Sequence, residues 1–298
     1  MALLRQLFPF FPIQFSSILL EVADKSSMEL EVKSLPLAEA FRCQIEEYRK
    51  WLTEANDPKR ASRWEKLLVH QDEAAIVEAC VRSLLANHVD SVKPAEDLSH
   101  GGPDFRCDVG TTHFYVECAC MTMKMVEEET ALPNAPTGEA FSYRNLTPRF
   151  FHRALAKERQ CGFFNDEPCL LAMGTLHEMA SALCFKELTA VYTLMSQPTI
   201  SCRMNTTTGD IVGEIRQETD LYSSVFLRPG KNGKELIEPA RRDVSGLLLC
   251  GFGVLPPRVY GVLHPDPARP FDRRLLQAIP FCRLANGWRS GHFEAEWV

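Results

Sequence analysis

The order of hydrophobic patterns along the chain predicts an α/β fold, with a mixed β-sheet flanked by helices. Apolar residues recur at helical spacing over residues 37–52 and 62–87, before the first strand signals. A hairpin signal follows at residues 104–120, and buried strands then alternate with helices. Because helical segments stand both before and between the strands, we expect both faces of the sheet to be covered.

Turn residues, helix breakers and apolar runs predict where each helix and strand begins and ends. Asn56-Asp57-Pro58 ends the first helix, and Gly110-Thr111-Thr112 forms the turn of the hairpin between strands 104–109 and 113–120. Strand alternation places Glu117 on the face opposite the more apolar stripe. The other expected elements are strands at residues 89–92, 168–173, 244–254 and 259–263, helices at residues 148–161 and 180–194, and a short helix around Leu275 and Leu276. The polar residues 199–243 predict a loop or hairpin excursion.

Composition is typical of a soluble globular protein, with 298 residues, 45% hydrophobic and 24% charged. The net charge of -6 argues against strong sequence-independent binding to nucleic acid, but it allows a local basic groove. Eleven cysteines without a Cys-x-x-Cys pair do not favour a zinc site. We interpret them as reduced, buried thiols, which indicates a reducing compartment and a cytoplasmic location.

The apolar segment at residues 1–20 is interrupted by Arg5 and Gln14 and broken by Pro9 and Pro12, so neither a signal peptide nor a membrane span is expected there. We expect residues 1–60 to form an N-terminal extension with a helix, and residues 61–298 to form the main domain with an insertion around residues 199–243.

Three acidic residues are the candidates for chemistry. Asp104 stands at the start of one hairpin strand and Glu117 near the end of the other, which makes a plausible seat for a hard divalent cation such as Mg²⁺. Glu78, on the preceding helix, offers a third carboxylate. In isolation Asp104 is also a common strand-start residue, and Glu78 is also a common solvent-facing acid. No such ordinary structural role suits Glu117, because an unpaired carboxylate in an apolar strand is unfavourable.

The order of several segments resembles the PD-(D/E)XK nuclease superfamily, and within it a bacterial branch. The segments are residues 78–85, 102–105 (Gly-Pro-Asp-Phe), 114–118 (Phe-Tyr-Val-Glu-Cys), 157–160, 168–172, 244–248 and 264–269, which together span residues 73–284. The resemblance implies a restriction-endonuclease-like fold and hydrolysis of phosphodiester bonds, in DNA more than in RNA. It also implies Mg²⁺ or Mn²⁺ held by Asp104, Glu117 and the backbone carbonyl of Cys118, with Glu78 at a second ion or a metal-bound water.

The chain departs from the family pattern at Ala119, where the family has a lysine two residues after the strand glutamate. One interpretation is that a lysine from elsewhere replaces it. Lys157, on the helix at residues 148–161, is favoured over Lys124, which is expected to lie beyond the strand. The other interpretation is a catalytically inactive member of the fold that binds nucleic acid or a protein partner.

The helix at residues 148–161 also carries Arg149, Arg153 and Arg159, which we expect to contact phosphates of a nucleic-acid partner. An ordinary solvated helix face is the alternative explanation for these charges. A homodimer is left open.

Overall fold

A computed structural model describes residues 37–134, 147–164, 166–184, 197–201, 207–208, 216–221, 224–230, 237–290 and 294–298. Its centre is an eight-stranded sheet in the order β1-β2-β3-β4-β9-β10-β11-β12. The strands are β1 (Ser91–Pro94), β2 (Phe105–Val109), β3 (Thr112–Met121), β4 (Cys169–Thr175), β9 (Gly246–Gly251), β10 (Arg258–Leu263), β11 (Phe281–Leu284) and β12 (Ala295–Trp297). The β3–β4, β4–β9 and β10–β11 pairs are parallel and the other pairs antiparallel, which confirms an α/β fold with a mixed sheet.

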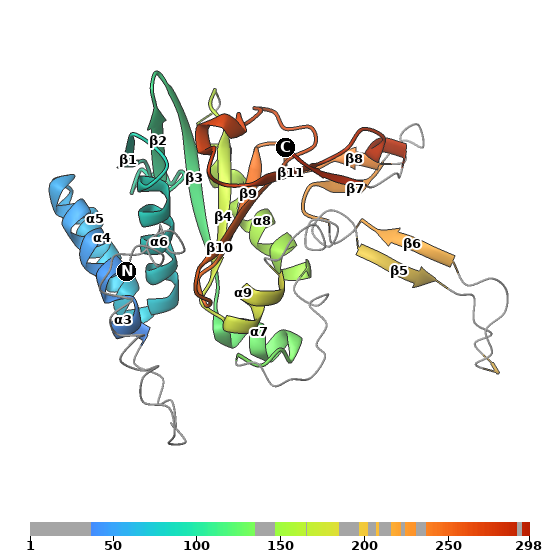
Figure 1. Cartoon of the computed structure of the whole chain (residues 1–298), viewed down its shortest axis with the longest axis horizontal. Coiled ribbons are helices and arrows are strands. Elements are labelled where there is room, and N and C mark those ends of the chain that lie inside the picture. The colour runs from blue at the N-terminus through green and yellow to red at the C-terminus, as the bar shows by residue number, and fades with distance from the viewer. Residues whose placement is uncertain are drawn as a thin grey trace, which may run out of the picture.

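Helices cover both faces of this sheet (Figure 1). One face carries α6 (Asp72–Ala86), with α4 (Arg42–Glu54) and α5 (Pro58–His70) packed against it and α3 (Leu37–Ala40) beside them. The other face carries α8 (Thr147–Cys161) over β3 and β4, together with α7 (Met123–Thr130) and α9 (Glu178–Cys184). Because both faces are covered, β4 and β9 are buried along their whole length and consist mostly of apolar residues, as expected for central strands.

Helix α4 belongs to the core although it lies within the segment expected to be an N-terminal extension. Its Tyr48, Trp51 and Leu52 side chains are buried. The Trp51 indole Nε1 donates to the carbonyl oxygen of Val92 in β1 at 3.0 Å. Burying an aromatic or leucine side chain contributes about 1.5–3 kcal/mol, so α4 is a substantial part of what supports β1 and β2. Residues 1–36 lie outside the described residues.

The single helix expected over residues 62–87 is instead two helices, α5 and α6. The chain leaves helical geometry at Gln71 (φ -146°, ψ 61°), and α6 begins with Asp72 and Glu73, whose charge suits a helix N-terminus. Helical periodicity continues across the break, which is why the sequence pattern does not reveal it. The break lets α5 fold back beside α6, so that Trp64 packs against Tyr48 of α4.

The remaining differences from the expectations concern short elements. Helix α7, β11 and β12 were not predicted, and the expected short helix at Leu275 and Leu276 is a 3₁₀ turn over Arg273–Leu276; a second follows at Trp288–Ser290. The polar excursion contains two hairpins, β5 (Gln197–Ser201) with β6 (Arg216–Asp220) and β7 (Leu227–Pro229) with β8 (Ile237–Pro239). Helix α9 ends at Cys184, and the rest of the helix expected there lies outside the described residues.

Candidate functional site

Glu117 and Lys157 form a buried ion pair between the sheet and helix α8. Alternation along β3 turns Glu117 toward α8, on the side of Tyr115 and Ala119. Lys157 Nζ donates to Glu117 Oε1 at 2.5 Å. The Glu117 side chain is 0% exposed and that of Lys157 is 27% exposed, so the pair is reached from solvent only along the lysine. Lys157, the lysine favoured over Lys124 from the sequence, therefore lies at the Glu117 carboxylate.

One oxygen of this carboxylate is unsatisfied. Glu117 Oε2 is buried and has no hydrogen-bond partner within the described part of the chain. Burial, and then the negative charge of Asp104, raise the pKa of Glu117 well above its ordinary value, although Lys157 opposes both. Burial lowers the pKa of Lys157, but the adjacent Glu117 outweighs it and the net pKa is raised. A buried acceptor without a donor is uncommon in folded proteins and marks a place where a further group is suited to bind.

Asp104 lies directly across the hairpin from Glu117. The β2–β3 register pairs Phe105 with Val116, and its continuation by one residue sets Asp104 opposite Glu117. The turn before it uses Gly102 at φ +115°, a conformation that favours glycine. Asp104 Oδ2 accepts the backbone N–H of Cys118 at 2.7 Å. Burial raises the pKa of Asp104, while the charge of Lys157 and the Cys118 N–H oppose that rise.

Glu78 approaches from α6 on the opposite side of Asp104. Its Oε1 accepts a hydrogen bond from the Tyr48 hydroxyl of α4. Burial, and then the negative charge of Asp104, raise the pKa of Glu78 to about 8, and the Tyr48 hydrogen bond works against this rise. Carboxylates whose pKa is raised this far by burial and like charge are typical of functional sites.

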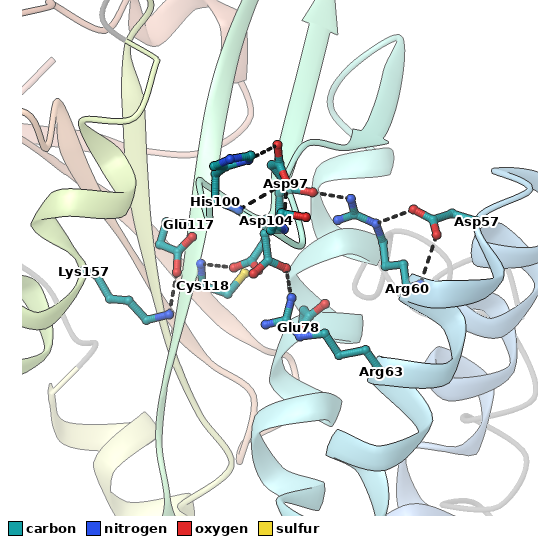
Figure 2. Close-up of polar contacts among 12 residues, drawn as sticks. Asp57, Arg60, Arg63, Glu78, Asp97, His100, Asp104, Glu117, Cys118 and Lys157 are labelled. Carbon is teal, nitrogen blue, oxygen red and sulfur yellow. Dashed lines mark hydrogen bonds and ion pairs between the residues drawn. The ribbon is translucent and has the colours of Figure 1, made fainter.

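Figure 2 shows these residues as a row that crosses strand β3, from Lys157 and Glu117 through Cys118 and Asp104 to Glu78. A cleft of about 250 Å³ opens on the Glu78 side of the row and is lined by Asp104 as well. Its other wall is formed by α5, which carries Arg60 and Arg63 (Figure 2). Arg60 donates to the backbone carbonyl of Glu96 and Arg63 to its carboxylate.

The donor chemistry of this row fits a hard divalent cation, because it consists of carboxylates and one carboxylate oxygen is unsatisfied. The side chains do not, however, already form a compact cage. Within the described residues, no three histidine, cysteine, aspartate or glutamate side chains are grouped closely enough to hold an ion. Protein donors occupy part of each carboxylate, namely Lys157 on Glu117, Cys118 on Asp104 and Tyr48 on Glu78.

The arginines expected to contact nucleic acid are divided between two faces of α8. Arg149, Arg153 and Lys157 follow one another at four-residue intervals and so share a face. Arg153 is partly buried, with its guanidinium 3.6 Å from the Met125 sulfur. Arg159 is exposed and, two residues beyond Lys157, lies on a different side of the helix.

The alternative lysine does not belong to the row. Lys124 lies on α7, beyond the end of β3 as expected, and its Nζ is 3.7 Å from Glu128 Oε1. Its side chain is 80% exposed, in contrast to that of Lys157.

Several residues of the site were not singled out from the sequence. These are Tyr48, Trp64, Arg63 and Glu96. A signal was available for part of this set, because Arg60, Arg63 and Lys66 recur every three residues and therefore lie toward one side of α5.

Comparisons with protein-family models, with curated proteins and with solved structures found no match to this chain. A search of the described residues found no helix with the length and apolar character that crossing a membrane requires.

Proposed function

We propose that this chain is a divalent-metal-dependent nuclease-like hydrolase of the PD-(D/E)XK type, with a restriction-endonuclease-like fold, acting on DNA in preference to RNA. The observation that carries the proposal is the buried Glu117–Lys157 pair beside Asp104, with Glu117 Oε2 left without a partner. It offers the acid, acid and lysine of such a site, although Ala119 stands at the usual lysine position.

In this proposal Asp104 and Glu117 hold Mg²⁺ or Mn²⁺ with the backbone carbonyl of Cys118, and Glu78 serves a second ion or a metal-bound water. The cation, when bound, lowers the pKa of a water and offsets charge on the phosphate. Lys157 places a positive charge at the carboxylate, where it orients Glu117 and stabilises negative charge that develops on a nearby phosphate oxygen. Tyr48 holds the Glu78 carboxylate in one orientation from α4.

Plasmid cleavage in Mg²⁺ or Mn²⁺ tests the proposal. Wild type should cleave, Glu117→Ala should lose cleavage, and Lys157→Ala should lose at least about tenfold in rate, within the range for electrostatic stabilisation of a transition state. Lys124→Ala is the matched control, because it removes an exposed lysine from the neighbouring helix and should leave the rate unchanged. Equal cleavage by wild type and Glu117→Ala would end the hydrolase proposal for that substrate.

A catalytically inactive, nucleic-acid-binding or protein-interaction module is the second candidate. The observation in its favour is that each carboxylate already has a protein donor and that no three-residue ion-holding group exists among the described residues. Calorimetric titration separates the two candidates. Binding of Mg²⁺ or Mn²⁺ that Asp104→Ala removes favours the hydrolase, and no heat at millimolar metal favours the module.

A further inference from the structure

The cleft beside the carboxylate row has a basic wall made by helix α5. Six α5 residues line it, and four of them are basic side chains, namely Arg60, Arg63, Lys66 and His70; Glu78, Glu96 and Asp104 also line the cleft. A second, more open hollow of about 450 Å³ adjoins it, because Arg63 and Lys66 line both hollows, and there Lys59 adds another positive charge. The basic wall therefore extends along the helix on both sides of Arg63 and Lys66.

The basic side chains of this wall differ in how far they are already engaged by the protein. Lys66 is exposed and has no ion pair or hydrogen bond with any residue that the structure describes. The Arg63 side chain is 57% exposed and pairs with Glu96. Arg60 is the anchored member, since it donates to Asp57 at 3.3 Å and is only 14% exposed.

Trp64 belongs to the packed lining of the same cleft. It is 3% exposed, and its indole Nε1 has no hydrogen-bond partner in the described part of the chain. The ring is held by stacking on Tyr48, with centroids 4.7 Å apart. The accessible donors of this cleft are therefore Arg63 and Lys66, and groups that donate but cannot accept suit an oxyanion.

We propose that α5 binds the backbone phosphates of the nucleic-acid strand that runs past the carboxylate row, with Arg63 and Lys66 as phosphate ligands. This inference rests on the proposed function for the position of the scissile phosphate. Helix α5 has 13 residues and is about 20 Å long, which is long enough to follow several phosphates. Glu96 competes with the phosphate for Arg63.

Anisotropy of a short fluorescein-labelled DNA duplex, measured in EDTA so that hydrolysis does not interfere, tests the inference. Arg63→Ala/Lys66→Ala should weaken binding at least about tenfold near 0.1 M salt, and the slope of log affinity against log salt should fall by about two. The matched control is Arg274→Ala/Arg283→Ala, which removes two exposed, ion-paired arginines from another part of the molecule. It should change neither quantity. Both double variants alter exposed side chains, so their urea unfolding midpoints should equal that of wild type. Equal midpoints would show that a loss of binding does not come from unfolding.

Two single variants sharpen the test. Glu96→Gln releases Arg63 and should strengthen binding several-fold, whereas Glu296→Gln, the partner of Arg283 at 2.7 Å, should not.

Unchanged affinity and salt slope in Arg63→Ala/Lys66→Ala would overturn the inference, as would an equal loss in the control pair. Loss confined to Arg149→Ala/Arg153→Ala would assign the phosphates to α8 instead. Displacement of the duplex by inorganic phosphate at matched ionic strength would show a site for free phosphate rather than a strand, and absence of duplex binding by wild type would also overturn the inference. The proposed function fails separately: if DNA binds through α5 and is never cleaved in metal, only the hydrolase proposal falls.

Discussion

Replacing Lys157 by methionine is the most direct test of the buried ion pair. Methionine preserves an unbranched chain of similar length but removes the charge and the donor at Glu117 Oε1. Glu117 Oε2 already has no hydrogen-bond partner among the described residues. The variant therefore leaves a fully buried carboxylate with neither of its oxygens satisfied by a charged partner.

The size of the effect follows from burial. Removal of one partner from a buried ion pair destabilises a protein by about 3–5 kcal/mol. The Lys157 side chain is 27% exposed, and water that enters along its path reduces the loss. We therefore expect a decrease of about 3 kcal/mol in the free energy of unfolding near pH 8.

The pH dependence of the stability of Lys157→Met provides a second, independent test of the buried pair. Burial raises the pKa of Glu117 in the folded protein, and loss of Lys157 raises it further. The folded state then binds a proton that the unfolded state has released, so stability falls as pH rises above the unfolded pKa of about 4.3. The effect of Lys157→Met should consequently be larger near pH 8 than near pH 5.

Urea unfolding followed by circular dichroism at both pH values measures this difference. Glu117→Gln/Lys157→Met should recover much of the lost stability, because the remaining buried amide carries no charge. Lys124→Met serves as the control, since that lysine is 80% exposed and its 3.7 Å pair with Glu128 contributes little. A loss below about 1 kcal/mol for Lys157→Met at pH 8, or no recovery in the double variant, would refute the buried-pair argument.

Three further outcomes follow from the same contacts. Tyr48→Phe removes the hydrogen bond that lowers the pKa of Glu78, so the rise of cleavage rate with pH should shift to higher pH, as a pH–rate profile would reveal. The pKa of Glu78 in the folded protein is raised to about 8, and a metal binds the ionised carboxylate, so Mg²⁺ affinity should increase up to about pH 8 with release of protons. Calorimetry in buffers of different ionisation enthalpy measures this release, and an affinity that does not change with pH would contradict the expectation. Gly174→Ala would place a methyl group against Val77 of α6, next to Glu78, and should lower stability by about 1–3 kcal/mol in urea unfolding; an unchanged midpoint would show that α6 moves freely.

Local patterns were sufficient for much of the fold. The hairpin at residues 104–120, the buried strands and α8 were expected from alternation, apolar runs and turn residues, and β2, β3, β4 and α8 are present close to those bounds. The break at Gln71 was not expected, because the residues on both sides keep helical periodicity. Short strands such as β12 were also not predicted, because three residues are too few to show the alternation of apolar and polar side chains that indicates a strand.

The candidate site could likewise be predicted from the sequence only in part. The sequence by itself determined which residues could do chemistry, because Glu117 in an apolar strand and Asp104 after Pro103 differ from their surroundings. It also raised Lys157 as a substitute for the lysine absent at Ala119. Only the tertiary structure brought Lys157 to Glu117, since the two are 40 residues apart and meet through the packing of α8 on β3.

The basic wall of α5 was likewise decided in three dimensions. Charges on an exposed helix have the same local sequence pattern whether they face open solvent or a cleft. The fold-back at Gln71 and the packing of Trp64 on Tyr48 turn Arg63 toward Glu96 and the carboxylate row. The order of residues determines which side chains and local elements are present. Which distant residues come together depends on how the buried faces of those elements pack, and no short-range sequence pattern determines that packing.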